Sequence, residues 1–203
     1  MRIILASASP RRAKLLALLV KNFSVEPSDI LEGSIYKRAR AAVDIAVKKA
    51  RAAQKSAKSG EQTLIVAADT AVWLGKRQCG KPADKEDAKD MLLALSGRRH
   101  TVYTGVCVIF GGSEYKFYEK SAVKFKKLDQ SAAEAYIEKY NPLDKAGAYG
   151  VQDNELVKGY LGSYTNIMGL PLERLESLFK KIEKKHGVKI LDEKQRRGFR
   201  PLD

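Results

Sequence analysis

Two kinds of apolar pattern take turns along the chain from its first residues onward. Continuous apolar runs at residues 2–6 and 64–68 are typical of buried strands, whereas stretches with apolar residues three and four apart are typical of helices. Strands that alternate with helices favour a mixed α/β layered fold over a helix bundle or a sandwich.

The pattern predicts a specific order of elements. The expected strands are residues 2–6, 23–29, 64–68, 71–74, 101–110, 115–128 and 156–160. The expected helices are residues 10–19, 34–58, 84–95, 129–140 and 172–186. Residues 111–113 are expected to form a hairpin connection, and Asp84 to cap the helix that follows it. A local break is expected at Asp69 and Thr70, so that Asp69 ends a buried strand.

Length, cysteine content and charge narrow the class of protein. A chain of 203 residues suits one domain, here residues 1–186, followed by a basic tail at residues 187–203. The two cysteines, Cys79 and Cys107, are too few for a disulfide framework. We expect a cytoplasmic protein without membrane association, because no apolar run could span a bilayer and the first residues lack a secretory signal.

The formal net charge of +14 predicts an attraction for phosphate-bearing ligands, and also for nucleic acid or acidic membrane. Much of this charge falls on predicted helix surfaces and in the tail, where it is solvated. The chain lacks an aromatic-rich RNA-binding signature and zinc-finger spacing, so nucleic acid is an unlikely partner.

Residues 5–12 form the first candidate for chemistry. A predicted strand runs through a loop with Ser7 and Ser9 into a helix that begins at Pro10, and Ser9 is a favoured N-cap residue. Free backbone N–H groups at a helix N-terminus favour an anion, and the guanidinium groups of Arg11 and Arg12 match phosphate oxygens. An ordinary capped helix with exposed arginines explains the same residues equally well.

Asp69 is the second candidate, because α/β sheets present ligand-binding groups where buried strands end. The alternative is an aspartate that caps the next turn. Lys81, between Gly80 and Pro82, suits a cation aimed into a site but is weak evidence alone. Lys49 can equally be one more solvated lysine on a helix.

The third candidate is the stretch of residues 144–152, where small residues let the backbone approach a ligand. Gln152 offers a donor and an acceptor that could read a base edge, although a tight structural loop explains the stretch as well. His100 and His186 show no metal-ligand spacing, so catalysis is expected to rest on carboxylates.

Taken together, these segments resemble the Maf family of nucleotide pyrophosphatases. The resemblance runs in order from Ile3 to about Phe179 and rests on the following segments: residues 5–12, 68–70, 80–82, 95–97, 104–106, 144–152 and 169–172. It implies a fold like that of inosine triphosphate pyrophosphatase, an elongated bent mixed sheet flanked by helices, with two lobes and a central cleft. It also implies a homodimer.

The resemblance assigns roles to individual residues. Asp69 is implied as the catalytic carboxylate, a divalent cation (Mg²⁺ or Mn²⁺) as the cofactor, and Asp69 with Glu32 as metal ligands. The residues implied to line the triphosphate site are Ser7, Ser9, Arg12, Lys49 and Lys81. Three further residues, Arg11, Thr70 and Gln152, match the branch of the family that acts on dTTP and UTP.

The predicted reaction is hydrolysis of a pyrimidine nucleoside triphosphate to its monophosphate and pyrophosphate. Water must attack the α-phosphorus while charge grows on the leaving group, which requires a base or a metal and several cations. Two alternatives stay open: a modified purine substrate such as 7-methyl-GTP, and a non-catalytic regulator that binds nucleic acid.

Overall fold

One mixed sheet organises the molecule. In the computed structural model, which describes residues 1–28, 30, 37–57 and 62–192, seven strands follow the order β2-β1-β3-β5-β6-β7, and β4 pairs with β3. The strands are β1 (Arg2–Leu5), β2 (Ser24–Val25), β3 (Thr63–Leu74), β4 (Arg77–Cys79), β5 (Arg99–Phe110), β6 (Ser113–Phe125) and β7 (Val157–Leu161). β1 is parallel to β2 and β3, and the other pairings are antiparallel. The predicted mixed α/β class is confirmed.

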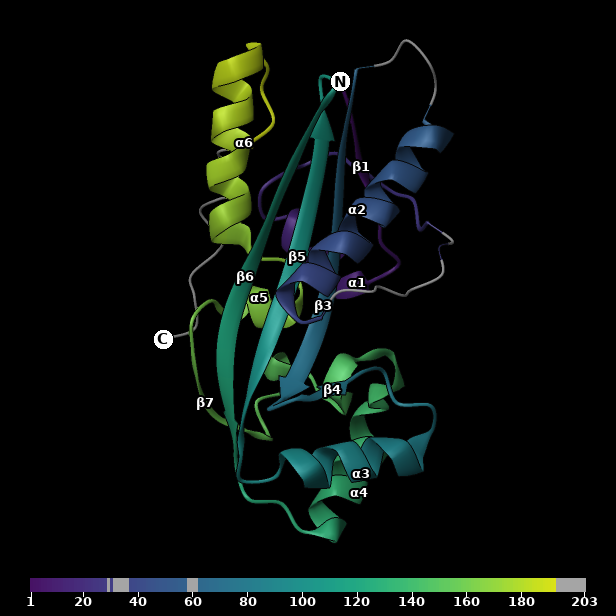
Figure 1. Cartoon of the computed structure of the whole chain (residues 1–203), viewed down its shortest axis with the longest axis vertical. Helices are drawn as coiled ribbons and strands as arrows, with labels where there is room; N and C mark the ends of the chain where they lie inside the picture. The colour runs from purple at the N-terminus through teal and green to yellow at the C-terminus, as the bar shows by residue number, and fades with distance from the viewer. Residues whose placement is uncertain (29, 31–36, 58–61, 193–203) are drawn as a thin grey trace.

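Helices cover the sheet unevenly along its length. They are α1 (Pro10–Leu16), α2 (Ala39–Ser56), α3 (Lys85–Leu95), α4 (Gln130–Tyr140), α5 (Tyr164–Met168) and α6 (Leu172–His186). Three 3-10 turns, η1 (Pro142–Asp144), η2 (Ala146–Ala148) and η3 (Val151–Asp153), follow α4. Figure 1 shows β3, β5 and β6 running from an upper half, which carries β1, α2 and α6, to a lower half, which carries β4, α3 and α4.

The two faces of the upper sheet bury different kinds of side chain. On one face, Ala46, Ala50 and Ala53 of α2 pack on small and aliphatic strand residues such as Ala67 and Cys107. These alanines let α2 lie close to the strands. On the other face, α6 contributes larger side chains to a core with Val106, Val108 and Phe110, the largest of them being Leu175, Phe179 and Ile182.

Strand β3 is paired without a break along most of one edge, whereas its pairing on the other edge is interrupted. On one edge it pairs with β5 from Ile65 to Trp73 without interruption. On the other edge β1 pairs as far as Val66, and β4 begins at Val72. The β3 residues between these two ladders therefore pair only with β5, and the sheet forks there. Asp69 and Thr70 lie at the fork.

The structure corrects several boundaries. Asp69 does not end a strand, because β3 continues through residues 69 and 70 to Leu74. α2 begins at Ala39, later than predicted, and residues 31–36 lie outside the described part of the chain. α1 ends at Leu16, after which residues 17–19 form a turn. The short helix α5 was not predicted.

The first residues of the predicted tail pack against the body of the molecule. Ile190 and Leu191 are buried, and their backbone N–H groups donate to Oε1 of Glu183 on α6. The backbone N–H of Asp192 donates to the carbonyl of Leu19. The rest of the predicted tail, residues 193–203, lies outside the described residues.

Candidate active site

A cleft of about 470 Å³ opens at the fork of the sheet. Residues from both halves of the molecule line it, including β3, α1, α2 and the segment from η1 to η3. Nine of the ten predicted site residues are among the lining residues: Ser7, Ser9, Arg11, Arg12, Lys49, Asp69, Thr70, Lys81 and Gln152. The tenth, Glu32, lies outside the described residues.

Asp69 and Lys49 form a buried ion pair on the α2 face of β3. The distance from Lys49 Nζ to Asp69 Oδ1 is 2.9 Å, and only 10% and 13% of the two side chains are exposed. Lys49 reaches Asp69 because α2 lies almost directly on β5. A Cβ atom on Gly105, the β5 partner of Asp69, would overlap the backbone of Ala42 and Val43 in α2.

Thr70 faces the opposite side of the strand, as alternation along a strand requires. Its hydroxyl lies 3.0 Å from Arg12 Nη2 and 3.1 Å from the Thr104 hydroxyl. Arg12 also donates from Nε to the carbonyl of Gly169 at 2.8 Å and from Nη1 to Ser7 Oγ at 3.1 Å. Arg12 thus joins α1, β3 and the end of α5.

The loop between β1 and α1 is ordered by its two serines. Ser9 caps α1, as predicted, because its side chain accepts from the backbone N–H of Arg12 and Pro10 occupies the first turn. The backbone N–H of Ser9 donates to Ser7 Oγ at 3.2 Å. Ser7 is itself 6% exposed and lines the cleft.

An ion-pair cluster joins the two sides of the cleft mouth. Arg11 Nη1 on α1 lies 2.7 Å from Asp144 Oδ2 on η1, and Lys145 Nζ lies 2.8 Å from Asp144 Oδ1. Burial alone would raise the pKa of Asp144, but the hydrogen bonds and charges of Lys145 and Arg11 outweigh it and the pKa is lowered. Asp144 and Lys145 were not singled out from the sequence, although they open the glycine-rich segment that was.

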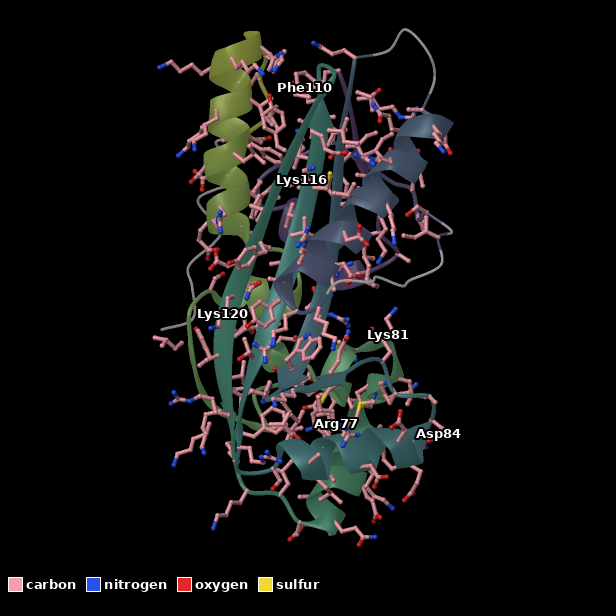
Figure 2. The ribbon with its side chains drawn as sticks, viewed as in Figure 1. Arg77, Lys81, Asp84, Phe110, Lys116 and Lys120 are labelled. Carbon is pink, nitrogen blue, oxygen red and sulfur yellow. The ribbon has the colours of Figure 1, made fainter. Side chains whose placement is uncertain are left out.

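Lys81 and Gln152 belong to the lower side of the cleft. In Figure 2, Lys81 extends from the connection after β4 toward the half that carries α2. Gln152 folds over Gly150, where a Cβ atom would overlap the amide nitrogen of Gln152.

The loop that carries Gln152 is fixed by a buried tyrosine. The Tyr136 hydroxyl donates to Asp153 Oδ2 and accepts from the backbone N–H of Gly150 at 3.0 Å. Burial, followed by the bond to Asp153, raises the pKa of Tyr136, so its hydroxyl stays protonated. The loop is therefore held from its core side.

Asp69 is the carboxylate of the cleft that could hold a metal together with a phosphate ligand. Among residues 1–28, 30, 37–57 and 62–192, no three His, Cys, Asp or Glu side chains come together as a metal site. Mg²⁺ is usually held by one or two carboxylates with substrate phosphates and water. Asp69, whose Oδ1 accepts from Lys49, fits that donor set.

Comparison with a known structure defines the class of fold. The Staphylococcus aureus Ham1 protein aligns with a TM-score of 0.50 and 13% sequence identity, covering 90% of this chain and 100% of that one. At this identity the likeness concerns the fold alone. It confirms the predicted bent mixed sheet flanked by helices.

Sequence comparison defines the family. A family model described as "Maf-like protein" matches residues 2–182. A dTTP/UTP pyrophosphatase of Thermotoga maritima is 40% identical over 174 residues, with 85% of each chain covered. One of Thermosipho africanus is 43% identical over 178 residues, covering 86% of this chain and 90% of that one. The chain belongs to the Maf-like protein family.

No helix within the described residues is both long and apolar enough to cross a membrane.

Proposed function

We propose that this protein is a nucleoside triphosphate pyrophosphatase that hydrolyses dTTP and UTP to the monophosphate and pyrophosphate. The observation that carries the proposal is the buried Lys49–Asp69 pair at the fork of the sheet, inside a cleft that Arg11, Lys81 and Lys145 also line. Family membership and relatives named as dTTP/UTP pyrophosphatases support the same reaction.

The chain's own groups supply a base and a set of cations. Asp69 accepts a proton from water as the water oxygen bonds to the α-phosphorus. The bond from that phosphorus to the bridging oxygen breaks, and this oxygen leaves with pyrophosphate. Lys49, Lys81 and Lys145 offset the charge that grows on the leaving group.

The proposal includes a divalent metal, Mg²⁺ or Mn²⁺, held by Asp69 together with phosphate oxygens, and Glu32 as a second ligand. When bound, such a metal neutralises phosphate charge and polarises the attacking water. A cytoplasmic homodimer also belongs to the proposal. Tyr118 and Leu161, 48% and 75% exposed on β6 and β7, offer apolar surface that a second copy could cover.

The pyrimidine preference rests on Arg11, Thr70 and Gln152 and on the names of the relatives. The Gln152 amide presents a carbonyl acceptor beside an NH₂ donor group, which suits the N3–H and O4 groups of uracil and thymine. Its loop is braced by Tyr136, so the amide is presented from a fixed backbone.

The decisive experiment is a panel of triphosphates assayed by products in the presence of Mg²⁺ or Mn²⁺. We expect dTTP and UTP to be hydrolysed faster than GTP or 7-methyl-GTP, with pyrophosphate as the first product. A reversed ranking would overturn the pyrimidine assignment. Orthophosphate as the first product would overturn the reaction, and retention of DNA or RNA without turnover would favour the nucleic-acid-binding alternative.

A further inference from the structure

A chain of hydroxyl groups leads from the buried face of the sheet to the cleft. Thr104 on β5 is fully buried and lies opposite Thr70 in the β3–β5 ladder. Its hydroxyl lies 2.9 Å from the carbonyl oxygen of Asn166 and 3.1 Å from the Thr70 hydroxyl. The Thr70 hydroxyl in turn lies 3.0 Å from Arg12 Nη2.

The direction of every bond in this chain is determined by its ends. A carbonyl oxygen can only accept, so Thr104 donates its one hydroxyl hydrogen to Asn166. The Thr104 oxygen therefore accepts from the Thr70 hydroxyl. A guanidinium can only donate, so the Thr70 oxygen accepts from Arg12. Each hydrogen bond from Arg12 through Thr70 and Thr104 to Asn166 thus has one donor and one acceptor.

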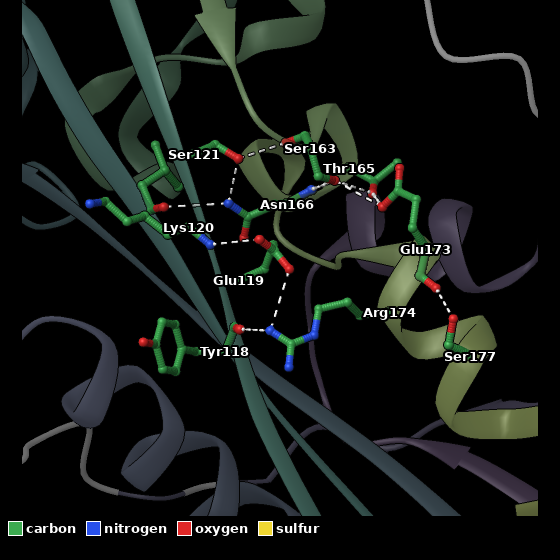
Figure 3. A network of polar contacts seen from close by, with 11 residues as sticks. Tyr118, Glu119, Lys120, Ser121, Ser163, Thr165, Asn166, Glu173, Arg174 and Ser177 are labelled. Atoms are coloured by element: carbon green, nitrogen blue, oxygen red, sulfur yellow. Dashed lines mark hydrogen bonds and ion pairs between the residues drawn. The ribbon is translucent and has the colours of Figure 1, made fainter. Parts of the chain in front are cut away.

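Asn166, the last acceptor in this row of hydrogen bonds, is held in place by several contacts. Asn166 is fully buried in α5, its backbone N–H donates to Ser163 Oγ at 3.0 Å, and its side-chain Nδ2 donates to Ser121 Oγ at 2.8 Å. Figure 3 shows these contacts beside the bonds from Ser163 and Thr165 to Glu173 at the start of α6. The carbonyl that receives the Thr104 hydrogen is thus fixed to β6 and to α6.

At the cleft, this row of hydrogen bonds determines that the Ser7 hydroxyl acts as a donor. Ser7 Oγ accepts from Arg12 Nη1 at 3.1 Å and from the backbone N–H of Ser9 at 3.2 Å. A serine oxygen has two lone pairs, so two donors use its acceptor capacity and leave the Ser7 hydroxyl hydrogen to be donated. Because Ser7 lines the cleft, it becomes a donor suited to a phosphate oxygen.

We propose that Thr104 is a positioning residue for the triphosphate site. Through Thr70 it fixes the plane of the Arg12 guanidinium, and Arg12 then holds Ser7 as a hydrogen-bond donor toward the substrate phosphates. This proposal rests on the proposed function, because it assigns the ligand of Ser7 as a phosphate oxygen. Arg12 accordingly orders the site through its bonds to Gly169, Ser7 and Thr70.

The test compares Thr104→Val with Thr104→Ser in the full chain. Valine keeps the shape but can neither donate nor accept, which leaves the Thr70 hydroxyl without its acceptor. We expect the KM for dTTP to rise about tenfold with kcat changed less than threefold. The lost bond should weaken the binding of the substrate and of the transition state by the same amount. Thr104→Ser restores the hydroxyl and should restore KM to within about twofold. An unchanged KM in Thr104→Val would overturn the proposal.

A double-mutant cycle with Thr70→Val asks whether the two threonines act through one chain. If they do, Thr104→Val should have almost no further effect on KM in the Thr70→Val background. Effects that multiply independently would overturn the proposal. If Thr104→Val does not fold, Thr104→Ala removes the same hydroxyl and takes its place in the cycle.

Two controls separate this inference from the proposed function and from general destabilisation. Ser96→Ala removes two hydrogen bonds to Leu128 outside the cleft, so it should lower the melting temperature and leave KM unchanged. Binding of inorganic tripolyphosphate, measured by calorimetry, should weaken about tenfold in Thr104→Val. Absence of dTTP turnover in the parent would refute the proposed function, whereas equal tripolyphosphate binding by parent and Thr104→Val would refute the positioning role alone.

Discussion

Asp69 and Thr70 are neighbours on β3, yet their two faces of the strand are built on different principles. Asp69 faces α2 and meets a charged partner, Lys49, at 2.9 Å. Thr70 faces α1 and α5 and joins a chain of hydroxyls that ends on a buried carbonyl. The Asp69 face thus holds a pair of charged groups, and the Thr70 face holds neighbouring groups in a fixed geometry.

This difference separates two kinds of mutational effect. Changes on the Asp69 face should alter turnover, because they change or displace the Lys49–Asp69 pair that we propose acts on the attacking water. Changes on the Thr70 face should alter substrate affinity or stability, because they release groups that the protein holds in place. A variant of the Thr70 face that lowered turnover as strongly as one of the Asp69 face would contradict this comparison.

Asp69→Asn should have the largest effect. It keeps an acceptor for Lys49 and removes the negative charge, so kcat for dTTP should fall on the order of 10²-fold or more, judging by the usual contribution of a general base. The measurement is steady-state release of pyrophosphate beside thermal melting. Asp84→Asn is the matched control, because Asp84 caps α3, is not among the lining residues, and asparagine caps equally well. Turnover by Asp69→Asn near the parental rate would remove Asp69 from the mechanism.

Gly105→Ala should come next, because it pushes α2 away from the sheet. The added methyl group would overlap the backbone of Ala42 and Val43, so α2 must move and carry Lys49 with it. We expect a loss of about 3 kcal/mol in the free energy of unfolding, together with a lower kcat. Gly159→Ala, where a Cβ atom meets nothing within 4 Å, is the control and should cost less than about 0.5 kcal/mol. Equal unfolding midpoints in urea for both variants would contradict the close packing of α2.

His100 lies on β5 four residues before Thr104, on the same face of the sheet as Thr70, and it allows that face to be tested by pH. Burial lowers its pKa from 6.5 to about 4, and its Nε2 lies 2.8 Å from the Tyr149 hydroxyl. The unfolded chain therefore takes up the proton first as the pH falls. The contribution of the neutral His100 to the free energy of unfolding is fully present above pH 6.5 and is lost as the pH drops toward 4. The slope from this group approaches about 1.4 kcal/mol per pH unit. His100→Phe should lose that part of the acid dependence, and identical slopes in both proteins would show that His100 is not the cause.

Asp144→Asn at the cleft mouth should have the smallest effect. Asp144 occupies Arg11 and Lys145, so its neutralisation should free both cations and lower the KM for dTTP by about threefold, in keeping with the modest strength of exposed ion pairs. Since the pKa of Asp144 is lowered, its ion pairs persist as the pH falls through the ordinary carboxyl range and are lost only at the lowered pKa. The difference in KM between Asp144→Asn and the parent should therefore shrink as the pH falls. A raised KM would instead make Asp144 a part of the binding site.

The fold class could be predicted because it depends on local patterns, whereas the assignment of the candidate site residues came from the family resemblance, and nine of the ten line one cleft. Apolar periodicity placed the main strands and helices, and Ser9 capped its helix as expected. The error at Asp69 has a physical origin: β3 loses its partner on one edge there while β5 continues on the other, and a one-dimensional pattern does not report which edge is paired.

Contacts between distant segments could not be predicted in this way. Arg12 and Gly169 are 157 positions apart, and nothing in either segment announces their hydrogen bond. The five residues of α5 are too few to show a helical period. Thr104 has the β-branched side chain of an ordinary strand residue. The role that we propose for its hydroxyl depends on Thr70, which lies opposite it on β3.

The uninterrupted strands also have a mechanical consequence. β5 pairs with β3 at nine positions and with β6 at twelve, and these strands pass through both halves of the molecule (Figure 1). The two halves are thus joined by the paired strands of one continuous sheet. If the cleft narrows around a substrate, β3, β5 and β6 must bend or twist together, because their pairing runs past the fork without a break.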